Sequence, residues 1–193
     1  VQMRIAVVGS GYVGLVSGAC FADFGHHITC VDSNAEKIAA LKSGVIPIYE
    51  PGLEDLVRSN SAAGRLEFTT DLAGTVARAD VVFIAVGTPS RRGDGHADLS
   101  YVFAVAREIA ASVDGFTVVV TKSTVPLGTG YEVERLIKQT NPKADIAVVS
   151  NPEFLREGSA IGDFKRPDRI VVGLSDERAR TVMTDVYRPL YLN

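Results

Sequence analysis

Glycines near the start of the chain have the spacing of a nucleotide-binding turn. A mostly apolar run, residues 3–8, leads directly into Gly9-Ser10-Gly11-Tyr12-Val13-Gly14. The first glycine permits a tight turn, the second lets the backbone approach a pyrophosphate, and the third lets a helix pack closely against a strand. The pyrophosphate then binds the free N–H groups where that helix begins. The pattern predicts that residues 9–14 bind a dinucleotide.

An acidic residue stands where such a site needs one. Asp32 closes the next apolar run, residues 28–31. There its carboxylate accepts hydrogen bonds from the ribose hydroxyls of adenosine, and its charge repels a 2′-phosphate. A glycine turn alone is weak evidence, because such turns are common. Here the strand, the helix and the acid agree, so we expect the cofactor to be NAD rather than NADP.

Three more polar segments follow apolar runs farther along the chain. They are Val86-Gly87-Thr88-Pro89, Lys122-Ser123-Thr124-Val125-Pro126 and Asn151-Pro152-Glu153-Phe154-Leu155-Arg156-Glu157-Gly158. Each also has a structural interpretation: the first as a turn, the second as helix caps, and the third as a helix start with both glutamates on one face. In a parallel sheet, ligands bind beyond the carboxyl ends of the strands. Because all three segments fall there, together they favour a site for the nicotinamide end.

The elements that must position these residues alternate along the chain. Apolar runs predict strands at 3–8, 28–31, 66–69, 81–86, 117–121, 146–149 and 169–174. Helical patterns separate them, with Asp71 expected to cap one helix. Repeated βα units predict an α/β fold, a doubly wound parallel sheet of the Rossmann type with helices on both faces. We expect a single domain over residues 1–193.

Composition and charge limit the kinds of partner that we expect the chain to bind. The formal net charge is −3 and no basic stripe is present, so we expect no nucleic-acid partner. No apolar run approaches the roughly 20 residues that span a bilayer, so we expect no membrane partner. The chain opens in a strand rather than a leader, which favours a cytoplasmic location. Cys20 and Cys30 form no CxxC pair, so we interpret them as small buried side chains and expect no metal site.

The four motifs stand in the order that a known family has them. On these residues the chain resembles the N-terminal domain of the UDP-glucose/GDP-mannose dehydrogenase family, essentially from end to end. Residues 157–160 (Glu-Gly-Ser-Ala) and 167–171 (Pro-Asp-Arg-Ile-Val) most resemble members that act on UDP-glucose. The resemblance implies NAD-dependent oxidation of UDP-glucose to UDP-glucuronate, with removal of two hydrides. In that family a cysteine traps the intermediate aldehyde, which splits one difficult step into easier ones.

The resemblance also implies roles for particular residues. Glu153 corresponds to a proton-transfer carboxylate, and Thr124 to a residue near the nicotinamide that helps hold a water. Lys37 stands near the adenosine ribose, where a cation also tolerates an extra phosphate. The implied cofactor contacts are Gly9, Ser10, Gly11, Tyr12, Val13, Gly14, Asp32, Lys37, Val86, Gly87, Thr88, Pro89, Ser123, Thr124 and Glu157. The implied substrate contacts are Glu153, Phe154, Leu155, Arg156 and Glu157.

One part of the family's machinery has no counterpart here. The nucleophilic cysteine of the family lies beyond residue 193, and neither Cys20 nor Cys30 matches it. We therefore expect the chain to be the NAD-binding part of a longer enzyme, lacking the central helix and the UDP-sugar domain, inactive alone and homo-oligomeric at full length. Two alternatives stay open: a relative that acts on GDP-mannose or a UDP-N-acetylaminosugar, and a non-catalytic NAD-binding module.

Overall fold

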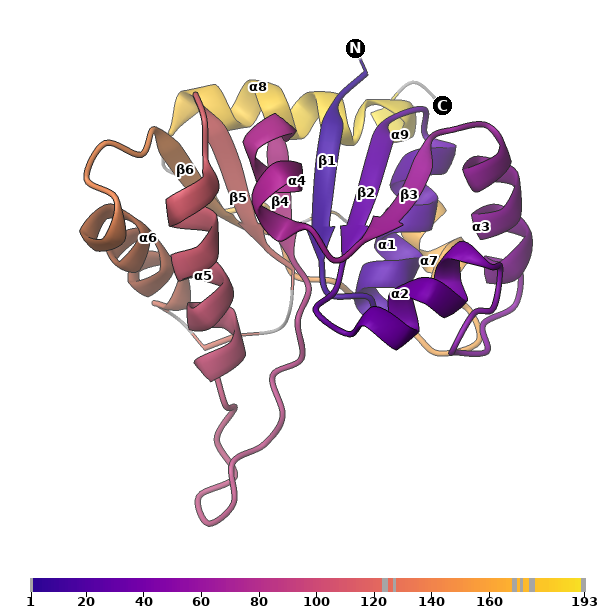
Figure 1. Cartoon of the computed structure of the whole chain (residues 1–193), viewed down its shortest axis with the longest axis horizontal. Helices are drawn as coiled ribbons and strands as arrows, with labels where there is room; N and C mark the ends of the chain where they lie inside the picture. Colours follow the sequence, from indigo (N-terminus) through magenta and orange to yellow (C-terminus); the bar gives the residue numbers. More distant parts are fainter. Residues whose placement is uncertain are drawn as a thin grey trace.

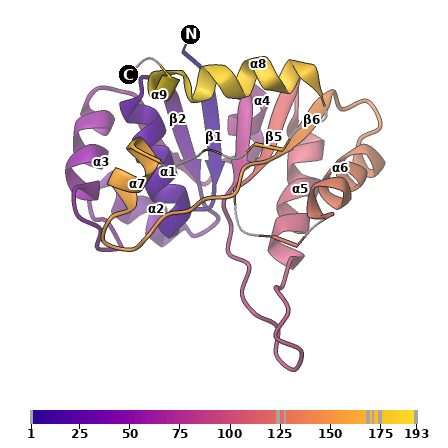
Figure 2. The ribbon, with the colours of Figure 1, turned by 180° about the vertical axis from the view of Figure 1, so that it is seen from behind.

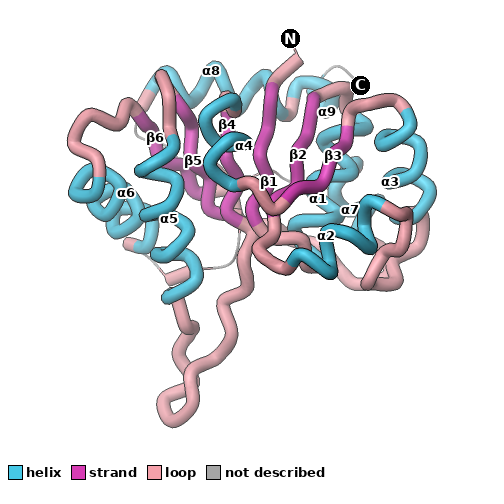
Figure 3. Tube along the Cα trace, in the orientation of Figure 1, coloured by secondary structure: helices cyan, strands magenta, loops and turns pink. Residues whose placement is uncertain are grey.

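The computed structural model describes residues 2–122, 125, 126, 128–167, 170, 172, 173 and 176–191. The strands are β1 (Arg4–Val8), β2 (His27–Val31), β3 (Leu66–Thr69), β4 (Val81–Ile84), β5 (Thr117–Thr121) and β6 (Ile146–Ser150). The helices are α1 (Tyr12–Asp23), α2 (Ala35–Lys42), α3 (Leu53–Ala62), α4 (Leu72–Arg78), α5 (Ser100–Ser112), α6 (Thr129–Thr140), α7 (Ala160–Lys165), α8 (Glu177–Val186) and α9 (Arg188–Tyr191). Figure 3 separates the two kinds of element by colour.

The strands that are described form one sheet in the order β3-β2-β1-β4-β5-β6, and every neighbouring pair is parallel. The order reverses between β1 and β4, where the chain leaves one half of the sheet and starts the other. Loops on either side of this point diverge and leave a crevice at the carboxyl ends of the strands. The doubly wound parallel sheet predicted from the sequence is confirmed.

Helices cover both faces of the sheet, as Figures 1 and 2 show from opposite sides. Side chains of β1 alternate between the faces: Ile5 and Val7 join the core beneath α1, α3, α7 and α8, whereas Ala6 and Val8 join the core beneath α4, α5 and α6. Strands buried on both faces are nearly continuous apolar runs. This explains why polar residues gather where the strands end.

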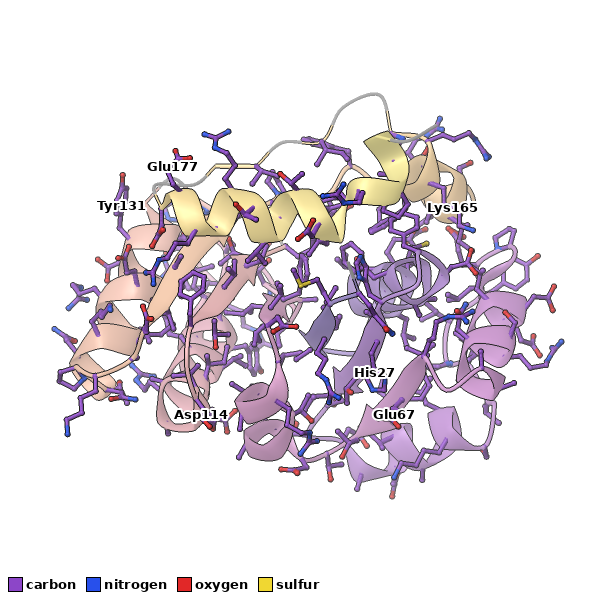
Figure 4. The ribbon with its side chains drawn as sticks, turned by 90° about the horizontal axis from the view of Figure 1, so that it is seen from above. His27, Glu67, Asp114, Tyr131, Lys165 and Glu177 are labelled. Carbon is purple, nitrogen blue, oxygen red and sulfur yellow. The ribbon has the colours of Figure 1, made fainter. Side chains whose placement is uncertain are left out.

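The amino ends of the strands lie on the side of the sheet opposite the predicted site. His27 of β2 and Glu67 of β3 lie side by side there, with Nε2 and Oε2 3.4 Å apart (Figure 4). Both termini also lie on this side, whereas the long β4–α5 connection projects from the opposite, carboxyl side (Figure 1). The predicted site therefore lies away from the chain ends.

The alternative structural interpretation of residues 151–158 as a helix start is wrong, because residues 151–156 are irregular and α7 begins only at Ala160. The Asn151 side chain cannot serve as a cap, since its Oδ1 accepts hydrogen bonds from Lys122 Nζ and the Tyr187 hydroxyl. The two glutamates of this segment thus share no helix face. By contrast, Asp71 caps α4 as predicted, accepting from the Gly74 N–H at 3.0 Å. Half of the expected strand over 169–174 lies outside the described residues; of the other half, Gly173 forms an isolated antiparallel bridge with Ser150.

We predict that Gly14→Ala destabilises the chain by at least about 2 kcal/mol, because the added methyl has no room. A Cβ on Gly14 would lie 1.9 Å from the carbonyl oxygen of Gly9, so backbone must move. Urea denaturation followed by circular dichroism measures the change. Gly11→Ala is the matched control: nothing lies within 4 Å of a Cβ there, so its free energy of unfolding should stay within about 1 kcal/mol. Equal losses in the two variants would contradict the packing argument.

Candidate functional site

A cleft of about 1010 Å³ opens at the carboxyl ends of the strands, at the point where the strand order reverses. It gathers most of the predicted cofactor residues from three separate parts of the chain. They are Gly9, Ser10, Gly11, Tyr12, Val13, Asp32, Lys37, Val86, Gly87, Thr88 and Pro89. Gly14 lies beneath the turn, and Glu157 is exposed outside the cleft lining. Ser123 and Thr124 lie outside the described residues.

Asp32 lies at the rim of this cleft and organises it. Its Oδ2 accepts hydrogen bonds from the Ser10 N–H at 3.1 Å and the Ser10 hydroxyl at 2.6 Å, and its Oδ1 accepts from the Asn34 N–H at 2.9 Å. Lys37 Nζ lies 3.9 Å from Oδ2. Partial burial opposes ionisation, but the hydrogen bonds and Lys37 outweigh it and hold the pKa of Asp32 below its usual value.

The turn itself fits a pyrophosphate. No side chain caps α1, and its first turn carries no acidic residue. The first N–H groups of the helix, which face the cleft, therefore have no acceptor side chain at the helix start. The backbone at Gly11 is open, because nothing lies within 4 Å of the position of a Cβ. Gly9 adopts a φ of 108°, a conformation that side chains rarely allow. The residues present thus fit a dinucleotide.

Glu153 connects the cleft with a second cavity. This cavity has a volume of about 660 Å³ and is lined by residues 151–156, by part of α7 and by Tyr187 at the end of α8. Glu153 lines both this cavity and the dinucleotide cleft. The carboxylate is half-buried, and its Oε2 accepts from the N–H of Leu155 at 2.6 Å. Glu153 therefore borders both the dinucleotide cleft and the second cavity.

The other predicted substrate residues lie along the same segment. Phe154 is 53% exposed, and Leu155 is half-buried. Arg156 makes a two-pronged ion pair with Asp163, with Nη2 2.8 Å from Oδ1 and Nε 3.1 Å from Oδ2. All three line the second cavity. The structure therefore groups these three residues with Glu153, whereas Glu157, also predicted to contact substrate, lines neither cavity.

Lys122 is a buried cation in the wall of the second cavity. Its Nζ donates to Asn151 Oδ1 at 3.2 Å and to the Tyr187 hydroxyl at 3.0 Å, and lies 5.4 Å from the centre of the Phe164 ring. Burial lowers the pKa of Lys122 to about 8, although the charge of Glu153 acts in the opposite direction. Lys122 belongs to one of the strand-end motifs, but the motif pattern predicts no role for it. A charged residue directly after a buried strand was the signal that could have found it.

The cysteines behave as predicted from their spacing. Cys20 and Cys30 are fully buried, and burial raises the pKa of each thiol to about 12. Among the residues that the structure describes, no cluster of His, Cys, Asp and Glu side chains is arranged to hold a metal ion. Within the same residues, no helix combines the length and the apolarity that crossing a bilayer requires.

Comparison with known proteins adds to this geometry. Residues 3–191 match the model of the UDP-glucose/GDP-mannose dehydrogenase family, NAD binding domain. Over 99% of its length the chain is 74% identical to UDP-glucose 6-dehydrogenase of Rhizobium meliloti and 48% identical to that of Pseudomonas aeruginosa. It spans 44% and 43% of these two relatives, less than half of their length.

Solved structures agree in fold. A UDP-glucose dehydrogenase from Pyrobaculum islandicum superposes with a TM-score of 0.94 at 43% identity, over 98% of this chain and 45% of that one. GDP-mannose dehydrogenase from Pseudomonas aeruginosa, in a ternary complex, superposes with a TM-score of 0.92 at 40% identity, over 97% and 44%. The same fold thus occurs in dehydrogenases that are named for different nucleotide sugars.

We predict that Lys122 makes stability rise with pH. The folded chain releases the Lys122 proton near pH 8, whereas the unfolded chain keeps it to about pH 10.4. The unfolded state therefore binds more protons between these values, and the cost of burying the charge is relieved as pH rises. The free energy of unfolding of the native chain relative to Lys122→Met should increase by up to about 3 kcal/mol from pH 7 to pH 10. Urea titrations across this pH range measure the free energy of unfolding of both proteins. If it changed with pH by the same amount in the native chain and in Lys122→Met, the prediction would be contradicted.

Proposed function

The chain belongs to the UDP-glucose/GDP-mannose dehydrogenase family, of which it is the NAD binding domain, and we propose that it is the cofactor-binding part of an enzyme that oxidises UDP-glucose to UDP-glucuronate. One observation carries the proposal: Glu153 lies at the junction of the dinucleotide cleft and the second cavity. The base that takes the alcohol proton must lie where the alcohol meets the nicotinamide, because the proton and the hydride leave adjacent atoms of the substrate. Glu153 is placed for that role.

The proposed NAD contacts follow from the cleft. Residues 9–13 hold the pyrophosphate with backbone N–H groups at the start of α1, and Asp32 accepts from the adenosine ribose. Lys37 Nζ lies 3.9 Å from Asp32 Oδ2 and offsets part of the repulsion of a 2′-phosphate, so the preference for NAD depends mainly on the ribose hydroxyls that Asp32 accepts from. Residues 86–89 line the same cleft on the other side of the strand reversal, toward the nicotinamide end.

The proposed chemistry converts a primary alcohol to a carboxylate. This oxidation removes two hydrides and consumes one water, and NAD supplies the acceptor for each hydride. Glu153 takes the proton from the reacting oxygen, while residues 154–156 border the sugar. Thr124 stays a prediction as the holder of a water. UDP-glucose is favoured because the relative that is 74% identical over this chain is a UDP-glucose 6-dehydrogenase.

We predict that Asp32→Ala weakens NAD binding by about 1–3 kcal/mol, because the Ser10 and Asn34 donors lose their acceptor along with the ribose. Calorimetric titration of the 193-residue chain with NAD and NADP measures this loss. The native chain should prefer NAD, and the variant should lose much of that preference. Asp55→Ala, which removes an exposed partner of Arg58, is the control and should leave both affinities unchanged. Tighter binding of NADP by the native chain would refute the assignment.

We predict that Glu153→Gln slows UDP-glucose oxidation by the full-length protein about 10²–10⁴-fold, the usual contribution of a general acid or base. NADH absorbance measures turnover, and Glu177→Gln at the exposed start of α8 serves as the matched control. The isolated 193-residue chain should bind NAD without turnover, because burial raises the pKa of both of its thiols and because it spans less than half of its relatives' length. GDP-mannose or a UDP-N-acetylaminosugar oxidised faster than UDP-glucose would change the substrate but keep the reaction class.

A further inference from the structure

A buried carboxylate outside the predicted site joins two parts of that site. Glu50 lies in the connection between α2 and α3, and only 5% of its surface is exposed. Burying an ionised carboxylate is costly unless hydrogen bonds satisfy its oxygens. The donors that satisfy Glu50 therefore show what the residue holds together.

Both Glu50 oxygens are engaged. Oε1 accepts from the Tyr12 hydroxyl at 3.0 Å, the Gly158 N–H at 2.9 Å and the Ala160 N–H at 3.1 Å. Oε2 accepts from the same Gly158 N–H at 2.8 Å. Burial, and after it the hydrogen bond and charge of Glu50, raise the pKa of Tyr12 above its usual value. The phenol therefore stays protonated and keeps donating.

The donors come from two separate parts of the chain. Tyr12 belongs to the glycine turn and lines the dinucleotide cleft. Gly158 lies near the end of the segment 151–159, which carries Glu153, and Ala160 begins α7 directly after it. The other end of that segment is held separately by the buried Lys122–Asn151 contact. Glu50 is thus the bridge, through one carboxylate, between the turn and the far end of the segment.

We propose that Glu50 is a positioning residue that couples occupation of the glycine turn to the placement of the 151–159 segment. A dinucleotide seated on residues 9–13 restrains Tyr12, and Tyr12 through Glu50 restrains Gly158 and Ala160. The segment that borders the substrate is then more ordered when the cofactor is bound. The proposal rests on the proposed function only in taking the 151–159 segment to face a nucleotide sugar.

Two substitutions distinguish coupling between the glycine turn and the segment 151–159 from a purely structural support of that segment by Glu50. Tyr12→Phe removes the hydroxyl that bridges to the turn and leaves Glu50 bonded to Gly158 and Ala160. Glu50→Gln replaces one acceptor oxygen by an NH₂ group, which cannot accept from an N–H. Because the Gly158 N–H contacts both Glu50 oxygens, the NH₂ group faces this donor in either orientation, and the segment side is disturbed. Glu54→Gln is the matched control, because Glu54 is an exposed glutamate of α3 paired with Arg58.

The test is hydrogen exchange of peptides covering residues 151–160 in the full-length protein, with and without saturating NADH. In the native protein NADH should slow exchange there by about fivefold or more. Tyr12→Phe should exchange like the native protein without NADH but lose that slowing. Glu50→Gln should exchange faster in both conditions, and Glu54→Gln should match the native protein. Measurement at saturating NADH keeps the site filled whatever the affinity of each variant.

Full NADH-dependent slowing in Tyr12→Phe, or none in the native protein, would overturn the proposal, because Glu50 would then only support the segment. If Glu50→Gln does not fold, the Tyr12→Phe comparison decides alone. Kinetics give a second readout: at saturating NAD, Tyr12→Phe should raise KM for UDP-glucose, whereas Glu54→Gln should leave it unchanged. A native protein that makes no NADH from UDP-glucose would refute the substrate, while the exchange result would still decide the coupling.

Discussion

The close approach of the first turn of α1 to the end of β1 is the constraint on which the site depends. A Cβ on Gly9 would lie 2.6 Å from the carbonyl oxygen of Ala85, just past β4, and the Gly9 N–H donates to the Val31 carbonyl of β2 at 2.8 Å. The turn is thus fixed between two strands while it packs against its own helix. Only residues without side chains allow three backbones to meet so closely. The N–H groups of α1 are held at the strand reversal as a result.

The sheet accounts for where the polar groups lie. Each central strand is buried on both faces, so its interior positions accept only apolar or well-satisfied side chains. Charged residues appear at the first positions past the strand ends, as with Asp32 after β2 and Lys122 after β5. Parallel strands present these ends at one edge. The polarity of the cleft is therefore a consequence of an apolar sheet.

Two buried charges hold the substrate-side segment at its ends. Lys122 fixes its start through Asn151, and Glu50 fixes its end through the N–H groups of Gly158 and Ala160. Both charges carry a desolvation cost that several hydrogen bonds offset. Regular structure is absent between these anchors. Glu153 thus sits on irregular backbone that is nevertheless positioned, as functional residues on loops commonly are.

The sequence by itself determined the parallel sheet, the glycine turn and Asp32, because these features depend on local periodicity and on residue types at fixed spacing. It also placed the strand-end motifs at one edge, since parallel topology brings them together. It failed at residues 151–156, where a good capping sequence is overridden by the Lys122 contact from another strand. It gave no role to Glu50, whose partners lie 38 and 108 positions away. Only the tertiary structure decided the conformation of residues 151–156 and the role of Glu50. The reason is that a buried charged side chain lies where the fold brings hydrogen-bond partners to it.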